Sequence, residues 1–185
     1  MNDSTTTTLP DLGTFEGFNF RNQSAIERTL TAEEVVHWDH DGDGEAEFWP
    51  SGEDPLVKGV FAGNVTGMEL MELAELLEQL DGDREENLLR IQFACQLQGE
   101  DLGQLTPERL DDVRPMIFYG DTFIEVRKTA AFELFELYWP DLYKAWNEDH
   151  AGVLTFDWDS FIDSPLWATH EVTLSEQKVL MISSN

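Results

Sequence analysis

Residues 66–80 read TGMELMELAELLEQL and have the most regular apolar pattern in the chain. Leucines recur at intervals of three and four residues, at Leu70, Leu73, Leu77 and Leu80. This spacing places side chains on one face of an α-helix. The motif Asp81-Gly82-Asp83 ends that helix and supplies the N-cap of a second helix over residues 84–98. Two helices joined by so short a turn predict a helical hairpin over residues 66–98.

Strand signals are concentrated after the hairpin. Residues 115–126 indicate two strands, and residues 153–158 and 168–182 contain further extended apolar runs. Between them, residues 128–146 have aromatic side chains at helical intervals, for which core packing is the favoured interpretation. Pro140 should divide this helix. The pattern predicts an α+β fold in which the hairpin packs on a mixed or antiparallel sheet from the C-terminal half.

The N-terminal part of the chain is less regular. Residues 1–13 are expected to form a disordered, threonine-rich leader, followed by a short strand at residues 14–20. Two capping-box motifs, Ser24-x-x-Glu27 and Thr31-x-x-Glu34, predict helix starts. The chain has 185 residues, 41% of them hydrophobic, with no internal repeat or long linker. We therefore expect one acidic α+β domain over residues 14–185.

The charge of the chain is its most unusual property. It has 38 Asp and Glu residues against 11 Lys and Arg, which gives a formal net charge of -27. Such a chain repels nucleic acid and anionic membranes, and it attracts cations and basic protein surfaces. The acids occur in the three segments 39–54, 66–112 and 133–163, interleaved with apolar residues, and not in one tail. They should therefore coat the folded protein.

The hairpin has the longest acidic series. Glutamates at three-residue spacing place successive carboxylates about 4.5 Å apart along a helix axis. Such a ridge can imitate DNA, which presents one charge per roughly 1.7 Å of axis. An ordinary solvated helix face is the alternative interpretation. The predicted partner-binding residues are Glu69, Glu72, Glu75, Glu78, Asp81, Asp83, Glu85 and Glu86.

A second acidic motif, DHDGDGEAE, spans residues 39–47. Calcium takes six to eight oxygen ligands, so carboxylates at alternate positions with intervening glycines suit it. The motif resembles the first half of an EF-hand loop, but Pro50 stands where that loop has its bidentate glutamate. Its spacing resembles instead the shorter calcium loops on β-hairpins of integrin-type repeats. The predicted ligands are the side chains of Asp39, Asp41, Asp43 and Glu47 and the carbonyl of Glu45. An acidic hairpin turn is the alternative.

Enzyme motifs are lacking. The sequence contains no GxSxG, GxxxxGK[ST], GxGxxG or CxxC motif. Asp157, Asp159 and Asp163 have the spacing of an acid–base group, but nothing near them specifies a substrate, so a solvated loop is the better interpretation. We predict that the protein is not an enzyme. Calcium is the only cofactor that the sequence suggests.

The sequence also indicates a location. Residues 1–13 lack the basic and apolar regions of a signal peptide. No apolar run approaches the roughly 20 residues that span a bilayer. Cys95 is the only cysteine, so no internal disulfide can form, which suits a reducing compartment. These features predict a cytoplasmic protein.

Three classes of function fit these observations. The first is an acidic nucleic-acid mimic that inhibits a nucleic-acid-handling protein by filling its basic groove. Antirestriction, anti-CRISPR and toxin-immunity proteins are similar in composition, being small, acidic and without catalytic motifs. The second is a calcium-binding module that uses residues 39–47. The third is an ordinary protein of a salt-loving organism, with which the low lysine content agrees. We favour the first, with a basic protein surface as the partner.

Overall fold

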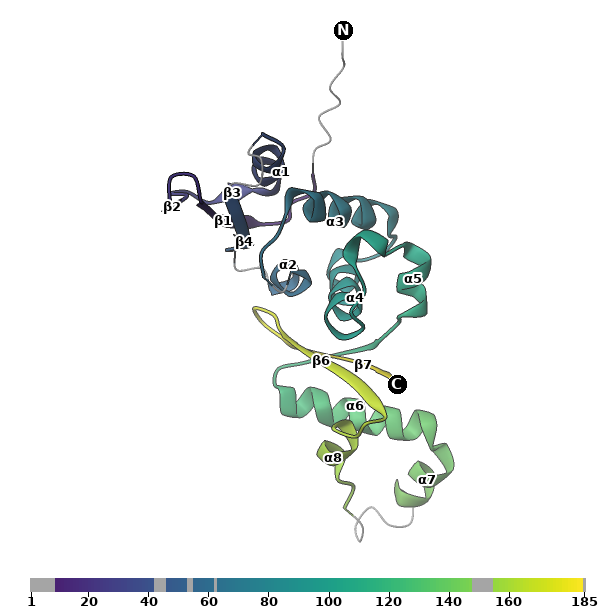
Figure 1. Ribbon diagram of the computed structural model, residues 1–185. Helices are drawn as coiled ribbons and strands as arrows, with labels where there is room; N and C mark the ends of the chain where they lie inside the picture. The colour runs from purple at the N-terminus through teal and green to yellow at the C-terminus, as the bar shows by residue number, and fades with distance from the viewer. Residues whose placement is uncertain (1–8, 42–45, 53–54, 62, 148–154, 185) are drawn as a thin grey trace. The chain divides into compact units, whose positions relative to one another are not determined.

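The structure is a computed structural model that describes residues 9–41, 46–52, 55–61, 63–147 and 155–184. The chain divides into two compact units, Met1–Val113 (unit 1) and Arg114–Asn185 (unit 2). Helix accounts for 49% and strand for 22%, the strands forming two small antiparallel sheets, so the predicted α+β class is confirmed (Figure 1).

The sheet of unit 1 is built around its first strand. Its strands are β1 (Thr14–Asn19), β2 (Ser24–Ala25), β3 (Leu30–Thr31) and β4 (Ala46–Pro50). β1 pairs antiparallel with the other three. Phe15 and Phe48 are fully buried, and Gly17 lets the strands approach, because a Cβ there would lie 2.7 Å from the Phe48 ring. Of the predicted leader, residues 9–13 instead contact unit 1: Leu12 is buried, and the Asp11 carbonyl accepts a hydrogen bond from Arg84.

One of the two N-terminal capping boxes is present. Thr31 and Glu34 exchange hydrogen bonds of 2.9 and 3.3 Å at the start of α1 (Ala32–Asp41), so residues 35–38 are helical. The helix start predicted at Ser24 is wrong. Ser24 lies in β2, where its backbone pairs with Asn19 of β1. The backbone N–H and C=O groups of this segment pair with β1 and are not available for the hydrogen bonds of a helix.

The predicted helical hairpin is present within unit 1. Its two helices are α3 (Gly67–Gln79) and α4 (Arg84–Leu97). Thr66 begins α3 in a capping box with Glu69, and the Asp83 side chain accepts from the Glu86 amide at the start of α4. The other helices are α2 (Pro55–Val60), a 3₁₀ turn η1 (Leu102–Gln104) and α5 (Pro107–Asp112), which Thr106 caps as its sequence predicts. Helix α1 packs on α3, and α2 packs on α4.

Unit 2 is a helix on a three-stranded sheet. Its strands are β5 (Met116–Gly120), β6 (Trp167–Thr173) and β7 (Lys178–Ser184), in the antiparallel order β5-β7-β6. The helices are α6 (Phe123–Tyr138), α7 (Pro140–Ala145) and α8 (Trp158–Ile162). Helix α6 covers one face of the sheet (Figure 1), where Val126, Ala130 and Leu134 pack with Leu180 and Ile182. Pro140 separates α6 from α7, as predicted.

Two strand predictions in unit 2 are wrong. Residues 115–126 form one strand and the start of α6, because the Thr122 hydroxyl accepts from the Glu125 amide and caps the helix. Residues 155–157 are irregular and lead into α8; residues 153–154 lie outside the described part of the chain. The strands predicted within residues 168–182 are confirmed as β6 and β7.

Candidate partner-binding surface

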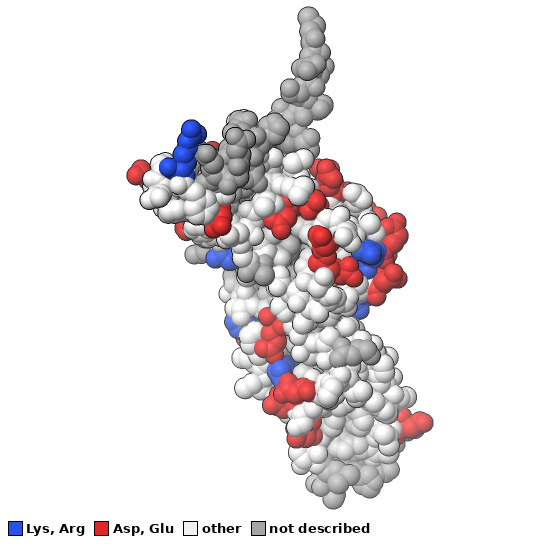
Figure 2. All heavy atoms as spheres, in the orientation of Figure 1, with Lys and Arg blue, Asp and Glu red and all other residues white. Residues whose placement is uncertain are grey.

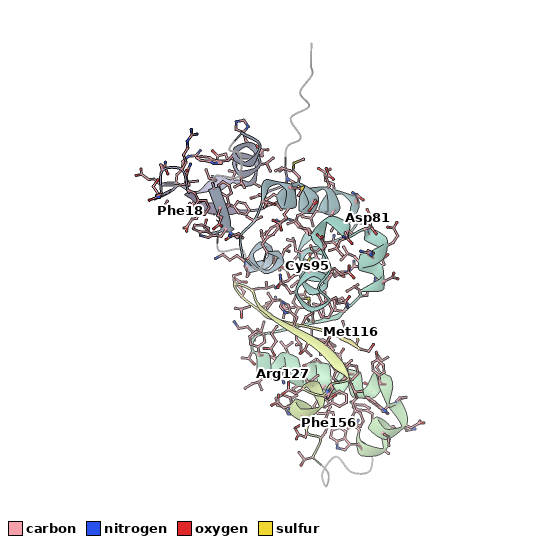
Figure 3. All side chains as sticks on the ribbon, viewed as in Figure 1. Phe18, Asp81, Cys95, Met116, Arg127 and Phe156 are labelled. Carbon is pink, nitrogen blue, oxygen red and sulfur yellow. The ribbon has the colours of Figure 1, made fainter. Side chains whose placement is uncertain are left out.

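The eight predicted partner-binding carboxylates are described as one feature, the α3–α4 acidic surface. It consists of four glutamates of α3, two aspartates of the turn and two glutamates of the first turn of α4: Glu69, Glu72, Glu75, Glu78, Asp81, Asp83, Glu85 and Glu86. Figure 2 shows carboxylates spread over this part of unit 1, and Figure 3 marks Asp81 at the turn. Burial of Leu70, Leu73 and Leu76 turns the opposite face of α3 toward solvent. Helical periodicity therefore puts the acids on the surface.

Two of these carboxylates also stabilise helix ends. Glu69 Oε2 accepts hydrogen bonds of 2.8 Å from both the backbone amide and the hydroxyl of Thr66. Asp83 Oδ2 accepts from the Glu86 amide at 3.1 Å. Both carboxylates satisfy backbone donors at a helix N-terminus, and a negative charge there is favourable. These hydrogen bonds fix the positions of both carboxylates, which therefore stabilise the helices with or without a partner.

Glu72 lies in a crowded position on the surface. It is half-buried against η1, where a Cβ on Gly103 would lie 2.6 Å from Glu72 Oε1. Burial, together with the negative charges of Asp101, Glu69 and Glu75, raises the pKa of Glu72 above its ordinary value of 4.5. The folded structure therefore disfavours the ionised form of the Glu72 carboxyl. The negative charges of α3 and of Asp101, which caps η1, therefore act together on the Glu72 carboxyl.

The α3 glutamates of this surface are not neutralised by cations among the described residues. Within the part of unit 1 that the structure describes, no Lys or Arg is ion-paired with Glu72, Glu75 or Glu78. Three arginines of α4 and α5 have other partners: Arg84 donates a hydrogen bond to the Asp11 carbonyl, Arg90 pairs with Asp111 at 3.0 Å, and Arg109 pairs with Glu100 at 3.2 Å. The α3 helix itself contains no basic residue. Within the described residues, Glu72, Glu75 and Glu78 therefore offer negative charge without a cation partner on a fixed helix.

We expect Glu72→Gln to raise the melting temperature at pH 7, because it removes a carboxylate whose charge the fold disfavours. A raised pKa in the folded state means that protonation stabilises the fold. The gain should therefore be present well above pH 4.5 and shrink as Glu72 itself becomes protonated toward pH 4. Thermal unfolding at both pH values measures this. Glu78→Gln is the control, since Glu78 is exposed. Equal gains at both positions would contradict the crowding at Glu72.

The predicted calcium ligands fall mainly outside the described residues. This applies to Asp43 and Glu45 and to the side chains of Asp39 and Asp41, whose backbone belongs to the last turn of α1. Glu47 is exposed in β4, opposite Phe18. Among the residues that the structure does describe, no group of three or more His, Cys, Asp or Glu side chains could hold a metal ion. Calcium binding by residues 39–47 stays a prediction.

A charged cluster in unit 2 escaped the sequence analysis. Arg127 of α6 forms ion pairs with Asp159 of α8, with Asp163 just after α8, and with Glu171 of β6. The Asp159 and Glu171 contacts are 3.0 Å long, and the Arg127 side chain is only 18% exposed. Burial lowers the pKa of Arg127, but hydrogen bonds with the three carboxylates outweigh it and raise this pKa. The cluster joins two helices and a strand.

The aspartates considered as an acid–base group have other contacts. Asp159 and Asp163 bind Arg127, and Asp157 caps α8 by accepting hydrogen bonds of 3.1 and 2.8 Å from the Ser160 amide and hydroxyl. These bonds, the backbone one first, lower the pKa of Asp157. All three aspartates thus have partners that account for them structurally.

The aromatic residues of α6 and α7 pack in a ring cluster that extends to α8 and β6. Phe135 and Phe156 stack at 4.7 Å, and Phe161 contacts Trp139 and Trp167 edge-on or tilted at 5.8 and 5.6 Å. The cluster packs on the buried core of unit 2, and Figure 3 shows Phe156 within it. Of the α6 and α7 aromatics only Trp139 packs directly against that core among the described residues, so core packing of the whole set stays a prediction. Tyr138 contacts the rings of Trp139 and Trp167 and is 46% exposed.

The lone cysteine is poorly suited to nucleophilic chemistry. Cys95 lies half-buried on α4, as labelled in Figure 3. Burial, and then the charges of Asp101 and Glu100, raise the pKa of its thiol to about 11. At neutral pH the thiolate, which is the reactive form, is therefore scarce.

Comparison with known proteins adds no relative: no family model, curated protein or solved structure matches this chain significantly. No helix in the described ranges is both long and apolar enough to span a bilayer.

Proposed function

We propose that this protein is an acidic inhibitor that binds the basic groove of a nucleic-acid-handling protein and competes there with the nucleic acid. The observation that carries the proposal is the α3–α4 acidic surface, whose glutamates 72, 75 and 78 have no Lys or Arg partner among the described residues. A partner that supplies Lys and Arg would relieve this uncompensated charge. Such binding needs no catalysis, which suits an inhibitor of the antirestriction, anti-CRISPR or immunity type.

The fixed helix supports mimicry of a phosphate backbone. Thr66 and the buried leucines 70 and 73 hold α3 in place, so the positions of Glu75 and Glu78 are set by helix geometry. The Cα atoms of Glu75 and Glu78 lie about 4.5 Å apart along the helix axis. Carboxylates at fixed spacing accept charge-assisted hydrogen bonds from the Lys and Arg side chains that bind phosphates. A flexible acidic tail would lose more conformational entropy on binding the same groove.

Net charge should govern the rate of encounter. A chain of charge -27 is steered toward a basic surface, which speeds association at low ionic strength. Exposed charges are screened beyond about 10 Å at 0.1 M salt. We therefore expect the association rate to fall steeply as salt rises, while the wild-type protein alone does not bind DNA.

The decisive experiment compares two matched charge reversals. Glu75→Lys with Glu78→Lys alters the α3 surface, and Glu133→Lys with Glu136→Lys alters exposed positions of α6 at the same three-residue spacing. Both variants change the net charge equally. Basic proteins captured from a lysate at low salt are purified, and displacement of their labelled nucleic acid by each variant is measured by fluorescence anisotropy. We expect the α3 variant to lose at least about tenfold in affinity, through lost charge pairs, and the α6 variant to change little.

Equal losses in the two variants would mean nonspecific acidity and not a binding surface. Binding of DNA by the wild-type protein without a basic partner would also contradict the proposal. If no partner is captured and the protein folds only at high salt, the acidity serves a saline solvent instead.

A further inference from the structure

The exposed face of α3 contains methionines as well as glutamates. Met68 is 69% exposed and Met71 is 44% exposed. They are three residues apart, so they lie on one face, which continues through Glu75 to Glu78. Single exposed apolar residues are common on protein surfaces. Two adjacent large ones that begin a stripe of carboxylates without a cation partner in the described part of the chain form a surface of mixed chemistry.

Each end of this stripe favours a different contact. Thioether side chains are flexible and polarisable, and they make favourable contacts with aromatic rings. Carboxylates favour Lys and Arg, and α3 has no basic residue of its own to satisfy them. Met71 and Glu75 are one helical turn apart, about 6 Å along the axis. A complementary partner would therefore present aromatic and basic side chains next to each other.

From this complementarity we infer that α3 binds a groove of the kind that holds single-stranded nucleic acid. Such grooves combine Lys and Arg with aromatic side chains on which bases stack. Surfaces that bind duplex DNA through its backbone rely mainly on basic and polar contacts to phosphates. In the single-strand groove the Glu75 and Glu78 carboxylates replace phosphates, and the Met68 and Met71 thioethers lie where bases stack. This inference rests on the proposed function and specifies the class of its target.

The local structure presents this stripe without rearrangement. Met68 lies in the first turn of α3, which the Thr66–Glu69 capping box holds through bonds of 2.8 and 3.2 Å. The helix has 13 residues and is thus roughly 20 Å long. That length is enough to contact several nucleotide positions of an extended strand's groove. The opposite face is anchored by Leu70 and Leu73, both fully buried.

Two synthetic peptides of equal positive charge test the inference. One alternates Lys and Arg with Trp, and the other has Ser in place of each Trp. Fluorescence anisotropy of labelled peptides against the full-length protein gives their affinities over a range of salt concentrations. We expect the wild type to bind the Trp peptide about fivefold or more tightly than the Ser peptide, because of the thioether–aromatic contacts.

Matched variants assign the preference to α3. Met68→Ser with Met71→Ser should remove the preference for Trp and leave the dependence on salt unchanged, because no charge is altered. Ile124→Ser with Leu137→Ser, at α6 positions that are 69% and 63% exposed, should keep the preference. Far-ultraviolet circular dichroism checks that each variant is folded. Met68→Leu with Met71→Leu, which keeps the apolar surface, serves if the serine variant is not folded and should reduce the preference.

The outcomes separate this inference from the proposed function. Equal, salt-sensitive binding of both peptides by the wild type would overturn the single-strand inference and leave the basic-groove proposal standing. So would a Trp preference that survives in the methionine variants. Failure to bind either peptide at low salt would contradict the basic-groove proposal itself.

Discussion

Arg127→Met is expected to lower the free energy of unfolding of unit 2 by about 1–3 kcal/mol. The substitution removes a largely buried guanidinium and leaves the carboxylates of Asp159, Asp163 and Glu171 together without their cation. Loss of a partner from a buried ion pair costs more than loss of a surface pair. The three carboxylates are 59%, 61% and 37% exposed, so solvent screens part of their repulsion and limits the effect.

Urea unfolding followed by tryptophan fluorescence measures this change, because four of the six tryptophans belong to unit 2: Trp139, Trp146, Trp158 and Trp167. The control is Arg109→Met in unit 1, where a half-exposed arginine pairs with Glu100 and donates a hydrogen bond to the Gln104 carbonyl. It should cost less than about 1 kcal/mol. Arg127→Lys keeps the charge but loses the forked geometry, so its effect should be intermediate. An Arg127→Met effect no larger than the control would show that the cluster stabilises nothing.

Phe135→Ala is expected to lower the free energy of unfolding by about 2–4 kcal/mol, more than Arg127→Met. The Phe135 ring stacks on Phe156 at 4.7 Å and contacts Tyr143 and Phe161 at 5.7 and 6.3 Å. Its removal leaves a cavity and breaks three ring contacts, each of which contributes beyond simple burial. Because Phe135 is only half-buried, the loss should fall below that of a fully enclosed phenylalanine.

Near-ultraviolet circular dichroism and urea unfolding together measure the loss of ring packing and of stability. Tyr138→Ala is the comparison, since Tyr138 is 46% exposed and should cost less. A Phe135→Ala variant with unchanged stability but impaired binding of a partner would reassign the aromatic cluster from the core of unit 2 to a binding surface.

The acidic residues of this chain include groups that make different contacts. Some cap helices, as Glu34, Asp83 and Asp157 do. Others surround Arg127. A third group, on the exposed face of α3, has no cation partner among the described residues. Composition counts all of them alike, whereas the contacts separate the carboxylates that already have a partner from those of α3 that have no cation partner among the described residues.

The sequence by itself determined the features that depend on near neighbours. The leucine period and the Thr66 and Asp83 caps place α3 and α4 at residues 67–97, and Pro140 ends α6. The same helical period turns the glutamates of α3 toward solvent, so that part of the candidate site was predictable. Caps, helical periods and proline effects all involve residues at most about four positions apart, which sequence inspection can examine.

Only the tertiary structure decided features that join distant segments. Ser24 became part of a strand through pairing with β1. Arg127 donates hydrogen bonds to carboxylates that lie 32, 36 and 44 residues further along the chain. The carboxylate of Glu72 was brought beside Gly103 of η1, next to the charge of Asp101. Strand pairing and charge clusters depend on which segments the folded core brings together, and a local pattern of residues does not contain that information.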